Sequence, residues 1–379
     1  MTTAHYIDIH LLQTLPYGNL NRDDLGSPKQ LTYGGVERTR VSSQAWKRVT
    51  RLAVEAAVGQ ETKRTRRVAQ AVRERLVHRG WDRELADAAG AQVLLSAVAG
   101  KDSGLKTEDN GSSSVLLYLP VTALDSLADL AEKHRDAIVA QTQAAASKPK
   151  PALPSEEVAR ILKTRNGTIH LFGRMLAELP GGNVDGAVQV AHAFTTHATE
   201  PQVDFFTAVD DLNRGDDKGS AHMSDAEFSA GVFYRYANVD IAGLREDLGA
   251  DSAPMARQLT AEFLIAFTRS MPTGKQHATA AQTLPDLIHV AVRADRPVSL
   301  AAAFESPVRA KGGWAEPSRR ALSDYAARLE KLWGREGIVW SGYASIDDAA
   351  FTGFGERVDS FTGLLDRALE SAFAQDAAA

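Results

Sequence analysis

The chain has 379 residues, of which 44% are hydrophobic and 24% charged, with a net charge of −5 at pH 7, values that are ordinary for a globular protein of two or three subdomains. It contains no cysteine, which excludes disulfides and thiolate metal sites. No apolar run reaches the length of a membrane span and the N-terminus lacks a signal-peptide pattern, so we expect a cytoplasmic protein without membrane contacts.

The first elements in chain order are a strand, a loop and a helix. Alternation over residues 6–12 predicts the strand, and the polar, glycine-bearing stretch 18–35 predicts the loop. Ser42 or Ser43 is a plausible N-cap of the helix that follows. Helical patterns then continue to about residue 95. The next stretches predict a loop at 101–114, a short strand at 115–120, a helix at 122–145 and a Pro-rich hinge at 144–154.

A β-rich body follows. The pattern predicts strands over 168–175, 184–196, 228–241, 287–293 and 338–340, and helices over 255–270, 318–333 and 357–373. Residues 195–227 form an excursion with few core-forming positions. The order of elements predicts an α+β fold with an RRM-like (ferredoxin-like) core and a mostly helical insertion.

The basic residues are distributed unevenly. Residues 1–85 carry 15 Lys and Arg against nine Asp and Glu, a surplus of six cations, which leaves −11 for the remainder. Such asymmetry indicates a polyanion-binding surface. For the basic stretch 63–83, a solvated helix face is the simpler interpretation.

The densest basic segment is 21–51. It combines the pair Gly34-Gly35 with the cations Arg38, Arg40, Lys47, Arg48 and Arg51 and with the polar residues Ser42, Ser43 and Gln44. Flexible backbone, hydroxyl and amide donors and guanidinium groups are what a phosphate-binding site needs. The alternative is an exposed helix face with a capping serine. We favour phosphate binding, because the helix dipole disfavours cations in the first turns unless an anion is near.

Other segments carry weaker signals. One interpretation has Arg174 facing a nucleic-acid backbone and Met175 packing on a base. The alternatives are an arginine at a strand edge and a methionine in the core, the more common place for methionine. The adjacent aromatics Phe205 and Phe206 suit an arm that stacks on bases or docks on a neighbour, or a cluster that closes the arm. Glycine-flanked Lys275 and the pair Arg309 and Lys311 add isolated cations.

We find no catalytic or cofactor pattern. The acid pairs 23–24, 210–211 and 216–217 can in principle hold Mg²⁺, but loop capping is the more common role of such pairs. His192 and His197 have no cysteine to complete a zinc site. We therefore predict no enzyme activity, no metal and no cofactor.

Several motifs together resemble one known family. They are Asn-Arg-Asp-Asp (21–24), Gly-Gly-x-x-Arg-x-Arg-Val-Ser-Ser-Gln (34–44), Gly-Arg-Met (173–175), Val-Asp-Gly-Ala (184–187), Thr-Thr-His (195–197), Phe-Thr-Ala-Val-Asp-Asp-Leu (206–212), Gly-Ser-Ala-His (219–222) and Gly-Val-Phe-Tyr-Arg-Tyr-Ala-Asn (231–238). This combination resembles the CasC-type backbone subunit of the type I-E CRISPR Cascade surveillance complex. The resemblance implies an RRM-like palm (1–59, 166–196 and 229–379), a helical fingers insertion (60–165) and an extended thumb hairpin (197–228).

The resemblance also implies site residues. Those expected on the RNA backbone are Arg22, Lys29, Ser42, Gln44, Lys47, Arg48 and Arg51. Those expected at bases are Met175, Phe205, Phe206, Thr207 and Val209, with Lys275, Arg309 and Lys311 as further contacts. From their own sequence context, Arg38, Arg40 and Arg174 are added to the RNA-binding set.

The family implies a non-catalytic protein that lines up along the CRISPR RNA spacer. Its expected partners are CRISPR RNA, neighbouring copies of itself head-to-tail, other Cascade subunits, and target DNA through the guide heteroduplex. Two alternatives stay open: a metal-dependent endoribonuclease that uses Asp23 or Asp24, and a general coat protein for single-stranded RNA.

Overall fold

The structure is a computed structural model that describes residues 3–97, 105–144, 150–208, 222–249 and 252–374. The chain divides into two compact units. Residues 1–54 and 188–379 form unit 1, and residues 55–187 form unit 2. Each unit is taken by itself below. Among the described residues, none of the helices has the length and hydropathy that crossing a bilayer requires.

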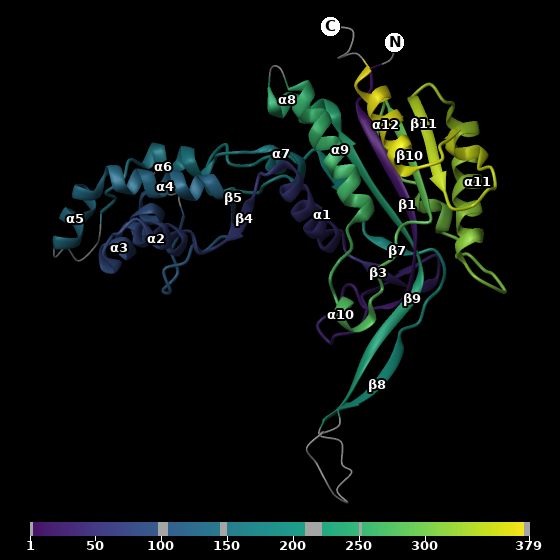
Figure 1. The fold of residues 1–379 in the computed structure, drawn as a ribbon, viewed down its shortest axis with the longest axis horizontal. Helices are drawn as coiled ribbons and strands as arrows, with labels where there is room; N and C mark the ends of the chain where they lie inside the picture. The colour runs from purple at the N-terminus through teal and green to yellow at the C-terminus, as the bar shows by residue number, and fades with distance from the viewer. Residues whose placement is uncertain (1–2, 98–104, 145–149, 209–221, 250–251, 375–379) are drawn as a thin grey trace, which may run out of the picture. The chain divides into compact units, whose positions relative to one another are not determined.

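Unit 1 is built on one mixed sheet (Figure 1). Its described strands are β1 (Tyr6–Gly18), β2 (Gln30–Tyr33), β3 (Val36–Val41), β6 (Val188–Val190), β7 (Ala193–Thr195), β8 (Gln202–Ala208), β9 (His222–Asp240), β10 (Leu287–Arg293), β11 (Ile338–Ser345) and β12 (Glu356–Arg357). The order across the sheet is β12-β11-β10-β1-β9-β7-β3-β2, with β6 and β8 also paired to β9. Strand β1 lies between two antiparallel neighbours, β9 and β10. It is buried along most of its length, Asp8, His10 and Gln13 included, because helices cover both faces of the sheet.

Helices cover both faces of this sheet. They are α1 (Ser43–Val58, whose last residues belong to unit 2), α8 (Ile241–Leu248), α9 (Ala253–Arg269), α10 (Gln276–Thr279), α11 (Ala315–Trp333) and α12 (Phe361–Ala372), with 3₁₀ turns at Ala301–Phe304 and Thr352–Phe354. Figure 1 shows α11 on one side of β1 and β10, and α1 and α9 on the other. Alternation along the strands follows this division, since Leu12 and Tyr234 pack beneath α11 whereas Arg235 lies over the Trp46 ring of α1.

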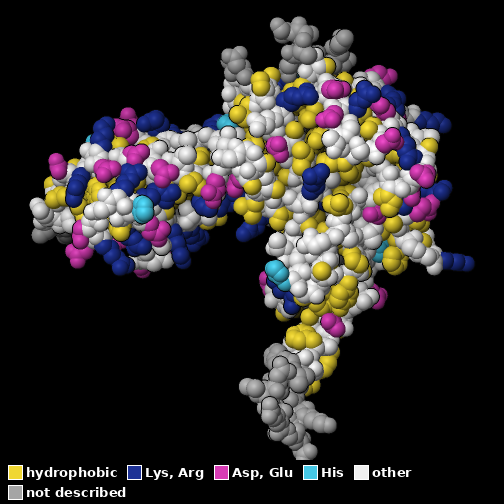
Figure 2. Space-filling model, viewed as in Figure 1, with side chains coloured by type: hydrophobic (Ala, Val, Ile, Leu, Met, Phe, Trp, Pro, Cys, Tyr) yellow, Lys and Arg dark blue, Asp and Glu magenta, His cyan; other side chains and the backbone are white. Residues whose placement is uncertain are grey.

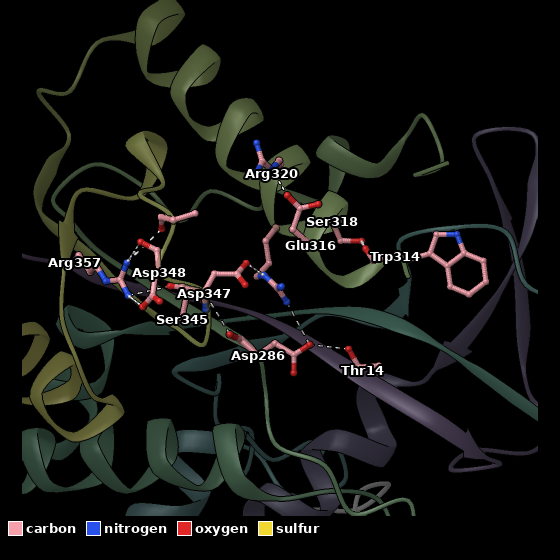
Figure 3. A network of polar contacts seen from close by, with 12 residues as sticks. Thr14, Asp286, Trp314, Glu316, Ser318, Arg320, Ser345, Asp347, Asp348 and Arg357 are labelled. Carbon is pink, nitrogen blue, oxygen red and sulfur yellow. Dashed lines mark hydrogen bonds and ion pairs between the residues drawn. The ribbon is translucent and has the colours of Figure 1, made fainter. Parts of the chain in front are cut away.

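An ion-pair network fixes α11 to the end of the sheet (Figure 3). The Nε atom of Arg319 lies 2.6 Å from a carboxylate oxygen of Asp347, and its Nη1 lies 3.6 Å from Asp286. The Thr14 hydroxyl donates to the same Asp286 carboxylate at 2.7 Å. Arg319 is nearly buried, so these contacts are shielded from solvent and hold the helix over β1 and β10.

Strand β9 extends beyond the sheet to form a hairpin with β8. Their register runs from Gln202 opposite Phe228 to Ala208 opposite His222. This hairpin coincides with the expected thumb. The thumb tip, residues 209–221, lies outside the described residues, and Val209 and the acid pairs 210–211 and 216–217 lie there with it.

Unit 2 is mostly helical. Its elements are β4 (Thr62–Thr65), β5 (Leu117–Pro120), α2 (Val68–His78), α3 (Arg83–Ser96), α4 (Val121–Lys133), α5 (Arg135–Gln143), α6 (Ser155–Leu162) and α7 (Gly167–Phe172). Val72, Leu76, Val93 and Leu127 are among the buried side chains of its core. Residues 55–187 therefore form a mostly helical unit, and the fingers insertion expected at 60–165 stays a prediction. The unit extends to residue 187, however, whereas the sequence suggested that the palm resumes at 166.

Two expected strands are wrong. Residues 168–175 contain helix α7, because Asn166 caps it by accepting the Ile169 N–H at 3.0 Å and Gly173 ends it at a φ of 76°. Three apolar residues, Ile169, Leu171 and Phe172, do not distinguish a strand from one buried helical turn. The expected strand 184–196 is two three-residue strands, β6 and β7, which pair with different parts of β9. The α+β class is confirmed, and the RRM-like description stays a prediction.

Candidate nucleic-acid interface

The N-terminus of α1 is the centre of the expected site, and Ser42 caps it. The Ser42 hydroxyl accepts the Ala45 N–H at 3.3 Å, and the Ser42 carbonyl accepts the Trp46 N–H at 3.2 Å. Trp46 is buried beneath the helix, which fixes the rotation of α1 on the sheet. The predicted N-cap is therefore confirmed.

The loop between β1 and β2 is tied to this helix start. The Asn21 Oδ1 atom accepts the Ser42 N–H at 2.8 Å, and the Lys29 N–H donates to the Asn21 carbonyl at 3.0 Å. Asn19 holds the base of the loop by donating to the carbonyls of Gly26 and Glu227, each at 2.9 Å. The loop therefore has a defined conformation that brings Lys29 next to the start of α1.

Asp23 has a structural role in that loop. Its Oδ1 atom accepts the N–H groups of Leu25 and Ser27, both at 2.9 Å, which is the turn-capping role that short acidic side chains commonly play. Asp24 is exposed. Within the described ranges, no group of three or more His, Asp or Glu side chains is arranged to hold a metal ion.

Five of the expected cations and polar groups are accessible around α1. Arg22, Gln44 and Arg48 are exposed, and Lys29 and Lys47 are half-buried. The Lys47 Nζ donates to the Val188 carbonyl at 3.3 Å. No acidic residue lies in the first turn of α1, so nothing in that turn neutralises the positive end of the helix.

Ser42 and Arg51 are buried, unlike the five residues above. The Ser42 hydroxyl is already used as the cap, and the Arg51 guanidinium lies one turn further into the helix. For these two residues, a direct phosphate contact stays a prediction that the geometry does not favour.

His192 is a member of this cluster that the sequence did not reveal. Its Nδ1 atom accepts the Ser43 N–H at 3.0 Å and lies 3.3 Å from Nη1 of Arg40. Burial, Arg40 and Lys29 all lower the pKa of this imidazole, so it is neutral. Because Nδ1 accepts, the ring proton is on Nε2, where it is available as a donor. The chain bends at His192, between the short strands β6 and β7, and the local sequence does not predict this bend.

The surroundings of Arg38 do not favour the predicted RNA contact. It is fully buried, and its guanidinium donates to three carbonyls at 3.0 Å or less: Thr195 at 2.9 Å, Phe304 at 2.7 Å and Tyr33 at 3.0 Å. Arg38 and Arg40 are two residues apart on β3 and therefore share one face of the strand, but Arg38 is enclosed by these carbonyls whereas Arg40 lies next to His192. Only Arg40 of the Arg-x-Arg pair lies at the surface cluster.

For Arg174, in unit 2, an RNA contact likewise stays a prediction that the geometry does not favour. Its guanidinium is buried and donates to the carbonyls of Gly182, Thr164 and Lys163, each at 2.8 Å. Burial lowers the pKa of Arg174 to about 10. The next residue, Met175, is 85% exposed, so the alternative of a core methionine is wrong.

The β8–β9 hairpin carries an apolar face. Val203 and Phe205 lie on the same side of β8 as Met223 does on β9, by strand alternation and register, and all three are more than half exposed. Figure 2 shows hydrophobic side chains gathered along this hairpin. Phe206 and Thr207 are exposed as well. The exposure of Phe205 does not fit a cluster that merely closes the arm.

The remaining candidates are on two loops of unit 1. Lys275 has a left-handed backbone (φ 54°) and follows Gly274, where a Cβ would lie 2.5 Å from the Leu20 carbonyl oxygen. This close approach places Lys275 beside the base of the β1–β2 loop. Arg309 and Lys311 are exposed on the loop before α11.

With this geometry in place, comparison with known proteins identifies the family. The family model described as "CT1975-like protein" matches residues 7–366. The chain belongs to the CT1975-like protein family. No curated protein sequence matches the chain.

Two solved structures are similar to this CT1975-like chain. One is a chain of a CRISPR RNA-guided surveillance complex described as pre-nicking, with 50% identity, a TM-score of 0.91, and coverage of 97% of this chain and 100% of that chain. The other is a chain of a CRISPR RNA-guided surveillance complex, with 44% identity, a TM-score of 0.81 and the same coverage. The similarity therefore covers almost the whole chain, and it is a similarity of sequence as well as of fold.

Proposed function

We propose that this protein is a non-catalytic, CRISPR RNA-binding backbone subunit of a type I-E Cascade surveillance complex. The observation that carries the proposal is the cation cluster around the capped N-terminus of α1, in a chain that is similar over its whole length to chains of CRISPR RNA-guided surveillance complexes. The cluster consists of Arg22, Lys29, Arg40, Lys47 and Arg48.

The chemistry of this cluster suits a guide-holding role. A protein that holds a guide must accept every spacer sequence, so it needs contacts to phosphates rather than to base edges. The cluster offers guanidinium and ammonium groups, the helix N-terminus and the Nε2–H of neutral His192, all of which bind phosphate without distinguishing bases. Sequence recognition is then left to base pairing between guide and target DNA.

The β8–β9 hairpin suits repetition along the RNA. Its apolar face, with Val203, Phe205 and Met223, is exposed on an arm that projects beyond the sheet. We infer that this arm reaches the neighbouring copy and contacts bases there, so that head-to-tail copies form an open filament along the spacer.

The endoribonuclease alternative is less favoured. The carboxylate of Asp23 already accepts two backbone N–H groups. Asp24 is exposed, and among the described residues no group of three acidic or histidine side chains that could hold a metal ion includes it. Incubating the assembled complex with RNA complementary to the guide and Mg²⁺ separates the two functions. Cleavage that disappears in Asp24→Ala would replace the proposed role by a nuclease.

The proposal is tested by purifying the complex with its other subunits and measuring the length of any bound RNA and its dependence on Arg48. We expect guide RNA of uniform length with the wild-type protein, and loss of RNA with Arg40→Ala/Arg48→Ala but not with the control Arg328→Ala on α11. Complexes that contain no RNA would contradict the proposal. Filaments on any RNA, without dependence on guide ends, would favour the general coat protein.

A further inference from the structure

A cavity of about 520 Å³ lies between α11 and the face of the sheet that is opposite to α1. Its floor is formed by His10 of β1 and His289 of β10, and its walls by the loop 295–300 and by α11 residues that include Leu329 and Trp333. The volume falls in the range of about 300–1,000 Å³ that is usual for small-molecule sites. None of Arg22, Lys29, Arg40, Lys47 and Arg48 lines it, so this cavity is a separate feature from the cation cluster described above.

The floor of the cavity is a column of aromatic rings. His10 stacks on His289 with centroids 5.3 Å apart, and the column continues to Tyr236 on one side and Phe354 on the other. His10 and His289 are directly opposite each other in the β1–β10 register. Because cross-strand packing holds both rings, their nitrogen atoms have fixed positions.

The hydrogen bonds of the two imidazoles leave both Nε2 atoms for a ligand. Nδ1 of His10 lies 2.9 Å from the Tyr234 hydroxyl oxygen, which also accepts the Leu300 N–H at 3.0 Å. A hydroxyl both donates and accepts, so either tautomer of His10 satisfies this contact. His289 donates from Nδ1 to the Gly342 carbonyl at 3.0 Å, so its Nε2 is an acceptor.

Both imidazoles are neutral, because burial lowers the pKa of His10 well below its usual range and that of His289 to about 4. Neither Nε2 atom has a hydrogen-bond partner within the part of the chain that the structure describes. The floor therefore presents two neutral imidazole edges, and the one at His289 is an acceptor. Edges of this kind can pair with the polar groups along the edge of a nucleobase.

The rim adds an aromatic group and a charge. The Trp333 side chain is 77% exposed, an unusual state for the largest apolar side chain. Arg296 is exposed and makes no ion pair with any described residue. An indole that can stack and a free guanidinium are suited to a heterocycle and a phosphate.

The wall of the cavity is already ordered. The Val298 N–H donates to the buried Asp8 carboxylate at 2.9 Å, and the same carboxylate lies 3.0 Å from Nε of Arg293. Together with the Leu300 bond to Tyr234, these contacts hold the loop 295–300 on the sheet. A ligand would therefore bind without the cost of ordering this loop.

We propose that this cavity binds a nucleotide, with the base at His10 and His289 and the phosphate at Arg296. The base edge exchanges hydrogen bonds with the two Nε2 atoms, and Trp333 stacks at the mouth. The nucleotide can be a free mononucleotide or a nucleotide within an RNA strand, since both present the same base edge and phosphate.

The test is equilibrium dialysis of the RNA-free full-length protein with radiolabelled AMP, GMP, CMP and UMP, and separately with short single-stranded RNA. We expect saturable binding of at least one mononucleotide, weakened tenfold or more by Arg296→Ala and by Trp333→Ala. The double substitution His10→Phe/His289→Phe keeps the column of rings but removes the nitrogen atoms of both imidazoles. It should abolish mononucleotide binding. The exposed substitution Arg328→Ala on α11 should leave it unchanged.

The outcomes distinguish the two sources and the failure of the proposal. Binding of short RNA but not of mononucleotides, with the same dependence on Arg296 and Trp333, identifies a strand as the source. No saturable binding up to a few millimolar, or binding that Arg48→Ala removes and Arg296→Ala does not, would overturn the proposal. If the His10→Phe/His289→Phe variant misfolds, the Arg296→Ala and Trp333→Ala variants still test the proposal, because both side chains are exposed and their removal leaves the fold intact.

Discussion

The Asn21 side chain accepts the backbone N–H of Ser42 at 2.8 Å, which joins the β1–β2 loop to the first turn of α1. This bond connects residues 21 positions apart in the two segments that carry the surface cations. The loop and the helix therefore form one surface. Substitutions are expected to have different effects when they remove a surface cation, a hydrogen bond that holds the loop, or an exposed side chain of the hairpin.

Asn21→Ala should weaken RNA binding although it removes no charge. The loss of one intramolecular hydrogen bond costs about 0.5–1.5 kcal/mol and frees the loop that carries Lys29. We expect a several-fold loss of affinity for RNA in filter binding, with an unchanged salt slope. A reduced slope would mean that the loop positions more than one phosphate contact.

Arg48→Ala should lower RNA affinity equally for all spacer sequences. If Arg48 contacts one phosphate, the slope of log K against log[salt] should fall by about 0.7, the value per contact for single strands. The matched control is Arg328→Ala, another exposed arginine in a helix of unit 1. A loss that depends on spacer sequence would contradict backbone holding.

Arg38→Ala and Arg40→Ala should separate stability from binding. Arg38 is buried and donates to three carbonyls, so its removal leaves them unsatisfied and should lower the free energy of unfolding by about 2–4 kcal/mol. Arg40→Ala should change that free energy by less than about 0.5 kcal/mol, as surface substitutions do, and reduce RNA binding. Urea unfolding and filter binding measure the two effects. Equal stability losses would refute the division of roles.

Phe205→Ala should leave the isolated chain stable and weaken the assembly. The ring is 60% exposed, so little apolar area is lost from the folded chain. If it stacks on a base of the RNA held by a neighbour, its removal should cost about 1–3 kcal/mol of binding. Thermal unfolding of the free chain and RNA binding of the assembled complex provide the comparison. Unchanged binding would mean that the hairpin is not the base contact.

Asp8 should make the folded state less stable as pH rises towards neutrality. Burial raises the pKa of Asp8 to about 7, above its value of about 3.8 in an unfolded chain, and outweighs the hydrogen bonds and Arg293, which act in the opposite direction. The folded protein then binds a proton that the unfolded chain releases between these values. The stabilisation is complete below about pH 4 and is lost as pH rises through about 7, at up to about 1.4 kcal/mol per pH unit.

The measurement is urea unfolding from pH 5 to 8 for the wild type and Asp8→Asn. The difference between the two free energies of unfolding should change with pH in that direction and level off above pH 8. A difference that is independent of pH would show that Asp8 stays ionised in the folded protein.

The sequence predicted elements well where a pattern was long. The helices at α9 and α11 and the strand β10 lie where periodicity placed them, because each is long enough to show its period. Residues 168–175 contain a helix instead of the expected strand, because their apolar pattern is too short to show a period and because Asn166 caps the helix. The α1 cap at Ser42 was predictable, since serine before a periodic run is a strong local signal.

The site was predictable only in part, because charge does not reveal direction. Arg38 and Arg174 look like Arg40 and Arg48 in the sequence, yet the first two are buried among carbonyls that come from distant segments. His192 entered the cluster through a bend between β6 and β7 that only tertiary pairing creates. Long-range contacts of this kind leave no local pattern to read.

The close approach of Gly274 to the Leu20 carbonyl has a consequence for biosynthesis. The loop with Arg22 and Lys29 leaves the ribosome early, but the segments that complete its support, Glu227 and Gly274, are translated roughly 200 to 250 residues later. A nascent chain thus displays its cations well before their scaffold exists. On the proposed function, tight binding of RNA is thereby postponed until most of the polypeptide has been made.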